Sequence, residues 1–222
     1  FLFLRYNLAD RFDLRLYCGG SVNDQDGECY KIFNAIIGNF GTWVESSNEP
    51  LGKKWNNTLV AAKEREFDYF MILGSDDFPS ISLFNTYFQY LDGKYNFIGI
   101  TDFYLLDILP LKTKLFEGYE NSYKDRTLGC GRLLSNGIIQ KNNYQLWNND
   151  LSSGLDMSMD KILNTTEGLC KKTLSCIEDD FAMVGIKSDF GLWKYSSYRG
   201  KVIELLDLMD YFNSDFRESI IY

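Results

Sequence analysis

The segment FDYFMILG, residues 67–74, constrains the fold more than any other part of the chain. It is an apolar run of strand length, the pattern of a strand that is buried on both faces of a parallel sheet. Two adjacent carboxylates, Asp76 and Asp77, follow it almost at once. Adjacent carboxylates repel each other and are costly to desolvate, so a strand that ends in this way needs a nearby positive charge.

Helical and strand patterns alternate along the chain. This alternation predicts an α/β fold with a mostly parallel sheet flanked by helices. Ligands bind in such sheets beyond the carboxyl ends of the strands, where Asp76 and Asp77 are expected. Helices are predicted at 2–9, 28–40, 52–66, 80–93 and 200–212, a loop that enters a helix at 152–163, and strands at 12–20, 42–47, 67–74, 95–107 and 181–189.

No internal repeat, low-complexity tract or linker interrupts the 222 residues, so a single domain over 1–222 is predicted. The chain has no initiator Met and opens within a helical pattern. We therefore expect it to be an N-terminally truncated piece of a longer reading frame.

Composition excludes several functional classes. A net charge of −8 without any Lys/Arg run argues against nucleic-acid binding. The absence of histidine excludes Ser-His-Asp and Cys-His catalysis and mixed Cys/His zinc sites. Five cysteines without a CxxC pair indicate a reducing compartment, and a cytoplasmic location is expected. No apolar run approaches the ~20 residues of a transmembrane helix.

Two interpretations of Asp76 and Asp77 follow from the residues alone. Paired carboxylates at a strand end suit a hard cation, Mn²⁺ or Mg²⁺, which in turn binds substrate phosphates. The stretch SDDFPS is also typical of a chain entering a helix, where aspartates cap the first turn.

Five short motifs occur in a fixed order. Together they resemble family-2-like GT-A glycosyltransferases, in particular the small bacterial, phage and large-virus members, over roughly residues 10–200. The resemblance implies a GT-A fold and transfer of a sugar from a nucleoside-diphosphate sugar, with a UDP-sugar expected, to a glycan or other hydroxyl acceptor. The motifs are G-x-KWN (52–56), ILGSDD (72–77), IGI-x-D-x-Y (98–104), G-x-GRLLS (129–135) and W-x₆-GLD (147–156).

The resemblance also assigns residues to the donor. It implies that Asp76, with Asp77 beside it, binds the metal that holds the diphosphate. Lys53, Asn56 and Ser75 are expected to contact the nucleotide. The alternative for the first two is a solvated lysine and a capping asparagine.

Two further assignments complete the predicted site. The resemblance places Arg132 near the donor sugar or its phosphates, where a guanidinium can bind phosphate through two hydrogen bonds. Asp156 is expected to be the general base of an inverting single displacement. Asp150 and Asp160 are the alternatives for the base, and an N-cap aspartate is the structural alternative.

The sequence departs from the family at Gly74, where many members carry the first Asp of the metal motif. This departure supports a rival prediction, a non-catalytic transferase-like module that binds sugar or a partner protein. A nucleotidyltransferase is a second rival, but the Gly-rich basic signature expected after its first strand is not found.

Overall fold

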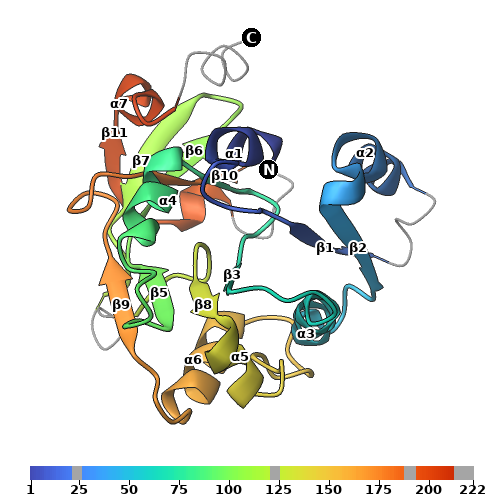
Figure 1. Ribbon diagram of the computed structural model, residues 1–222. Coiled ribbons are helices and arrows are strands. Elements are labelled where there is room, and N and C mark those ends of the chain that lie inside the picture. Colours follow the sequence, from blue (N-terminus) through green and yellow to red (C-terminus); the bar gives the residue numbers. More distant parts are fainter. Residues whose placement is uncertain (22–26, 121–125, 188–193, 213–222) are drawn as a thin grey trace. The chain divides into compact units, whose positions relative to one another are not determined.

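The chain forms two compact units in this computed structural model (Figure 1). Each unit combines two separate stretches of sequence, and each is described by itself. The predicted single domain over 1–222 stays a prediction. The residues described are 1–21, 27–120, 126–187 and 194–212. Unit 1 comprises Phe1–Phe70 and Ser135–Leu169, and unit 2 comprises Met71–Leu134 and Cys170–Tyr222.

Unit 1 is built on a parallel pair of strands, β1 and β2. Their register runs from Leu16 opposite Gly41 to Ser21 opposite Ser46. Parallel neighbours need a crossover connection, and here α2 lies within it. The elements are α1 (Leu2–Leu8), β1 (Leu16–Ser21), α2 (Glu28–Ile36), β2 (Gly41–Ser46), α3 (Leu51–Ala62), α5 (Asn136–Lys141) and α6 (Leu155–Asn164), with a 3₁₀ turn at Gly38–Phe40.

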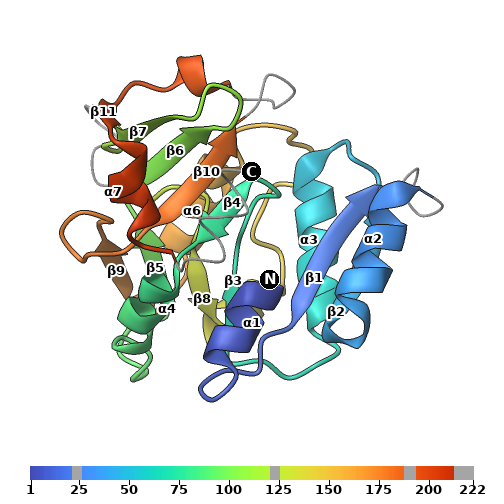
Figure 2. The ribbon, with the colours of Figure 1, turned by 90° about the horizontal axis from the view of Figure 1, so that it is seen from above.

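Helices α2 and α3 cover opposite faces of this strand pair (Figures 1 and 2). On the α2 face, the ring of Trp43 lies 5.5 Å from that of Tyr30 and 5.4 Å from that of Phe33, between centroids. Two glycines of β1, which have no side chain, leave room for this close packing on both faces. A Cβ on Gly20 would meet the Trp43 ring, and one on Gly19 would meet Thr58 of α3.

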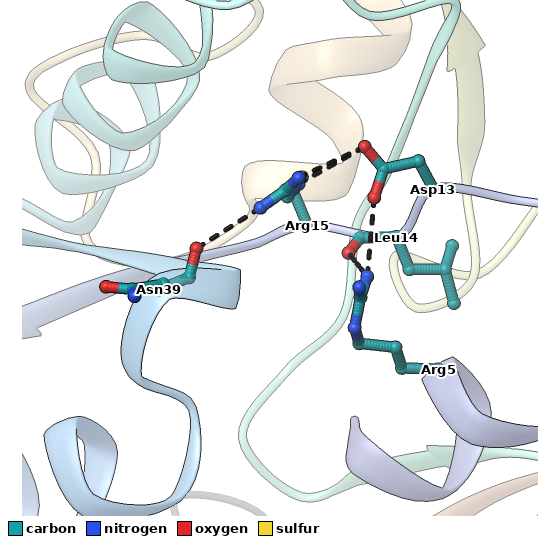
Figure 3. Close-up of polar contacts among 5 residues, drawn as sticks. All are labelled: Arg5, Asp13, Leu14, Arg15 and Asn39. Carbon is teal, nitrogen blue, oxygen red and sulfur yellow. Dashed lines mark hydrogen bonds and ion pairs between the residues drawn. The ribbon is translucent and has the colours of Figure 1, made fainter. Parts of the chain in front are cut away.

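A charged cluster holds the segment between α1 and β1 (Figure 3). Arg5 donates from Nη1 to Asp13 Oδ1 at 3.3 Å and to the Leu14 carbonyl at 2.9 Å. Arg15 donates to Asp13 Oδ2 and, across the strand pair, to the Asn39 carbonyl at 3.2 Å. Burial acts to raise the pKa of Asp13, but the hydrogen bonds from Arg15 and Arg5 outweigh it and lower the pKa. The small stabilisation from this exposed carboxylate is therefore present above its ordinary pKa and lost as the pH falls through the lowered value.

Unit 2 contains a five-stranded sheet in the order β11-β7-β6-β10-β4 and a four-stranded sheet in the order β3-β8-β5-β9. Two of these strands cross the limits of the unit in the sequence, since Tyr69 and Phe70 of β3 and Ser135 of β8 belong to unit 1. The elements are β3 (Tyr69–Met71), β4 (Asp77–Pro79), α4 (Ile81–Phe88), β5 (Phe97–Ile100), β6 (Phe103–Asp107), β7 (Lys112–Phe116), β8 (Leu133–Ser135), β9 (Lys171–Leu174), β10 (Met183–Lys187), β11 (Lys201–Ile203) and α7 (Leu205–Met209), with a 3₁₀ turn at Tyr195–Ser197.

The α/β class is confirmed, but the prediction of a mostly parallel sheet is wrong. Parallel pairs are β1–β2, β6–β10 and β5–β9, whereas β4–β10, β6–β7, β7–β11 and β5–β8 are antiparallel. The antiparallel strands β4, β7, β8 and β11 are short, and β7 and β11 carry lysines. They show no apolar run that would reveal them in the sequence.

The predicted strand 95–107 is two strands in different sheets, β5 and β6. The strand is interrupted at Thr101 and Asp102, and Asp102 is only 5% exposed. Its carboxylate accepts hydrogen bonds from Cys176 N at 2.6 Å and Ser175 Oγ at 2.7 Å. A buried carboxylate must find such donors, so the strand gives way where Asp102 turns to meet them.

Most other predicted elements are confirmed, with shorter bounds. The helices at 2–9, 28–40, 52–66 and 80–93 correspond to α1, α2, α3 and α4, and the loop and helix at 152–163 correspond to α6 and the residues before it. The strands at 12–20, 42–47, 67–74 and 181–189 correspond to β1, β2, β3 and β10, although 188–189 lie outside the described residues. The helix predicted at 200–212 is wrong in its first turn, which forms β11 before α7 begins.

No helix in the described ranges combines the length and the apolarity needed to cross a bilayer.

The packing of Gly20 against Trp43 gives a first prediction. In Gly20→Ala the new Cβ would lie 1.8 Å from the Trp43 ring, so the variant should lose about 1–3 kcal/mol of unfolding free energy through overpacking. Gly137→Ala is the matched control, because this exposed glycine of α5 has no neighbour closer than 4.0 Å and should gain up to ~1 kcal/mol. Urea unfolding of both variants measures this, and equal stabilities would contradict the packing described.

Candidate functional site

Asp76 and Asp77 lie on a tight turn between two strands, which we call the acidic turn (residues 74–77). β3 ends at Met71 and β4 begins at Asp77. Asp77 N donates to the Gly74 carbonyl at 3.3 Å, and Gly74 N donates to Asp77 Oδ2 at 2.6 Å. The alternative interpretation as a helix cap is wrong, because Ser80 caps α4 by accepting from Leu83 N.

A buried lysine supplies positive charge to the acidic turn. Lys187 Nζ lies 2.6 Å from Asp76 Oδ2, and the side chains are 8% and 45% exposed, respectively. Lys187 is the last residue of β10. The preceding residue, Ile186, donates its N–H to the Asp76 carbonyl at 2.7 Å. Backbone and side chain of Asp76 are thus both bound to the end of β10.

Gly74 is explained by the geometry of the same turn. A Cβ at this position would lie 3.0 Å from both Asp76 Oδ1 and Asp77 Oδ2. The two carboxylates therefore converge on the face of Gly74 where a side chain would project. An aspartate at this position, as in many of the glycosyltransferases that the sequence resembles, would add a third carboxylate in this space, which favours glycine here.

The donors of the acidic turn fit a divalent cation poorly. Mg²⁺ and Mn²⁺ need several oxygen ligands. Within the described ranges, no group of three or more carboxylate or thiol side chains could hold a metal ion. The Lys187 ammonium also opposes a cation beside Asp76, since unit charges ~4 Å apart interact by ~4 kcal/mol at an effective dielectric of 20, and a dication doubles this. The predicted Mn²⁺ or Mg²⁺ stays a prediction.

Arg132 lies in the interior of unit 2, with 1% of its surface exposed. Its Nε donates to the Leu128 carbonyl at 2.7 Å and its Nη2 to the Thr127 carbonyl at 2.9 Å. These bonds hold the loop before β8, so the guanidinium has a structural role. The predicted phosphate contact of Arg132 is not tested by these bonds. Ser75, by contrast, is exposed at the tip of the acidic turn.

Asn56 in unit 1 is a buried hydrogen-bonding hub. Its Oδ1 accepts from Leu146 N at 3.0 Å and Trp147 N at 3.2 Å. Its Nδ2 donates to the Trp147 carbonyl at 2.7 Å and to Asn149 Oδ1 at 2.9 Å. All four hydrogen-bonding positions of the amide are used, so Asn56 fixes the 146–149 loop to α3.

At the start of α3, one residue is bonded within the chain and the next faces solvent. Gly52 N donates to the Leu151 carbonyl at 2.8 Å, so this amide of the helix start is already satisfied within the chain. Lys53 is exposed beside it. The motifs at 52–56 and 147–156 thus contact each other, and the nucleotide role of Lys53 stays a prediction.

The face of α3 that meets the strand pair carries polar residues that the sequence analysis did not single out. Lys54 Nζ lies 2.6 Å from Asn48 Oδ1, and Asn57 Nδ2 lies 3.1 Å from Ser46 Oγ. Ser46 ends β2, opposite Ser21 at the end of β1. We call Ser21, Ser46, Asn48, Lys54 and Asn57 the β1–β2 rim.

Asp156 lies in the first turn of α6, whose N-cap is Gly154 with a φ of 65°. The capping alternative for Asp156 is therefore wrong, although a carboxylate in this turn also favours the helix dipole. Ser158 lies two residues after Asp156 in α6. Its hydroxyl oxygen accepts a hydrogen bond from Asn148 N at 2.8 Å and so joins α6 to the 146–149 loop. Asp150 is exposed in that loop, and Asp160 lies further along α6. The catalytic role of Asp156 is untested.

The sequence contained signals for the residues that were missed. Lys187 ends an otherwise apolar strand and is buried, and a buried lysine needs an acidic partner. Lys54 and Asn57 are three apart on α3, which places them on one helix face. Only the fold shows that this face meets the strand ends.

Comparisons with known proteins do not assign a family. No protein-family model and no curated protein matches the chain. Among solved structures, the chain is similar to the inositol-1-phosphate CTP transferase from T. maritima, with 15% sequence identity and a TM-score of 0.49. The match covers 90% of this chain and 73% of the transferase chain. A TM-score below 0.5 is too low to support an argument about family or activity.

The role of Asn56 gives a second prediction. Asn56→Ala should cost about 2–4 kcal/mol, because it leaves buried amide and carbonyl groups of the 146–149 loop unpaired. Asn57→Ala is the control on the same helix and removes one partly buried hydrogen bond, so it should cost ~1 kcal/mol or less. Chemical denaturation measures both. A stable Asn56→Ala variant with lost ligand binding would instead favour the nucleotide role predicted from the sequence.

Proposed function

We propose that the chain is a glycosyltransferase that moves a sugar from a nucleoside-diphosphate sugar to an acceptor hydroxyl. The β1–β2 rim is the observation that carries this proposal. Parallel strands present ligand sites beyond their carboxyl ends, and here those ends carry Ser21 and Ser46 beside a lysine of α3. Hydroxyl and amide groups suit a ribose or base, and an ammonium suits a phosphate. The five motifs of the family resemblance supply the transferase chemistry.

The proposed reaction is a single displacement. The Asp156 carboxylate takes the proton of the acceptor hydroxyl while the acceptor oxygen forms a bond to the anomeric carbon of the sugar. The bond from that carbon to the phosphate oxygen breaks, and the nucleoside diphosphate leaves with the electron pair. Attack from the opposite side inverts the anomeric configuration.

A binding module without catalysis is the second candidate. The ion pair between Lys187 and Asp76 favours it, because this pair occupies one oxygen of the expected metal ligand. Release of free sugar from a UDP-sugar, or transfer to an acceptor, would exclude this candidate. Release of pyrophosphate from a nucleoside triphosphate and a sugar phosphate would indicate a nucleotidyltransferase instead.

The rim predicts which lysine binds phosphate. Lys54→Met should weaken UDP binding about tenfold, the loss of one charged contact worth ~1.4 kcal/mol. Lys63→Met, at the other end of α3, should bind UDP as the unchanged protein does. Calorimetric titration measures both. If Lys53→Met alone weakens binding, the phosphate lies at the residue expected from the sequence instead of at the rim.

The base assignment is tested separately. Asp156→Asn should lower the rate of sugar transfer or hydrolysis by about 10²–10⁴-fold, the usual contribution of a general base, while the Kd for UDP stays unchanged. Asp150→Asn and Asp160→Asn should keep their activity. Loss of activity in either of these two, with Asp156→Asn active, would move the base to that residue.

A further inference from the structure

The acidic turn concentrates negative charge. Asp76 Oδ1 and Asp77 Oδ2 both lie 3.0 Å from the position of a Cβ on Gly74. Two carboxylates that converge in this way repel each other and need compensation from hydrogen bonds or positive charge. Either a bound cation or the chain itself must supply it.

The chain supplies compensation to each carboxylate. Lys187 Nζ meets Asp76 Oδ2 at 2.6 Å, which is the distance of a short charge-assisted hydrogen bond. Gly74 N meets Asp77 Oδ2 at the same distance. One carboxylate is therefore neutralised by an ammonium and the other is bound by a backbone amide.

Lys187 is held in this position by its surroundings. Only 7% of the residue is exposed, and it ends the strand that pairs with both β4 and β6. The adjacent Ile186 N–H is bonded to the Asp76 carbonyl. An ammonium that left Asp76 would remain buried without its counter-charge, which is costly. The ion pair is therefore a fixed part of the turn.

We propose that Lys187 takes the place of the divalent cation at the acidic turn, so that the turn binds neither Mg²⁺ nor Mn²⁺. Removal of the ammonium leaves the Asp76 carboxylate without its counter-charge and removes the repulsion that a cation beside Asp76 would meet. For the nucleotide, which rests on the proposed function, the consequence is that a nucleoside diphosphate binds equally well with and without metal.

Titration of the whole chain with Mn²⁺ alone, followed by the EPR signal of the free ion, tests the proposal. The unchanged protein should bind no Mn²⁺ at the turn at about 1 mM, the weak end of protein sites for divalent cations. Lys187→Met and Lys187→Gln should each gain a Mn²⁺ site at least tenfold tighter, and adding Asp76→Asn should abolish it. Lys114→Met is the control, because Lys114 is also buried in unit 2 but donates to the Tyr198 carbonyl; it should gain no site.

Two results would overturn the proposal. One is a Mn²⁺ site in the unchanged protein that Asp76→Asn removes. The other is the absence of any gained site in folded Lys187 variants. If neither Lys187 variant folds, the titration of the unchanged protein and of Asp76→Asn still decides.

Titration with UDP in EDTA and in Mn²⁺ separates this proposal from the proposed function. Equal affinity in both supports the role of Lys187, and affinity that requires Mn²⁺ counts against it. If UDP binds under neither condition, the proposed function fails, while the Mn²⁺ titration still decides the role of Lys187.

Discussion

The contact between the Lys187 ammonium and the Asp76 carboxylate is the constraint on which the candidate site of unit 2 depends. This contact joins the end of β10 to the turn that leads into β4. Next to the ion pair, the Asp76 carbonyl accepts a hydrogen bond from the backbone N–H of Ile186. Two adjacent carboxylates could otherwise not be held on a partly buried turn without a bound cation. The charge balance of the turn is therefore a property of the fold.

Buried polar side chains serve the fold in the same way at three other motifs. Asn56 secures the 146–149 loop, Asp102 marks the break between β5 and β6, and Arg132 binds the carbonyls before β8. In each case a side chain satisfies backbone groups that secondary structure leaves unpaired. A motif rich in Asn, Asp and Arg is therefore no guide by itself to a ligand, because loop positioning requires the same residues.

Periodicity predicted the long elements well and the short ones poorly. The amphipathic helices α2, α3 and α6 and the apolar strand β10 appear where their patterns indicate. β7 and β9 begin with lysines and contain only four or five residues. β7 pairs with the adjacent strand β6, but β11 and β5, the further partners of β7 and β9, are distant in the sequence, so the mixed character of the sheets could not be read from the chain.

The sequence by itself determined the α/β class, the acidic pair after an apolar strand and the exclusion of histidine chemistry, because these follow from local pattern and composition. Only the tertiary structure decided that Lys187 meets Asp76, that Asn56 and Arg132 point inward, and that Lys54 and Asn57 face the strand ends. The physical reason is range. Helix and strand formation depends on neighbours within a few residues, whereas the partner of a charge is set by the packing of segments that lie 111 residues apart in the case of this ion pair.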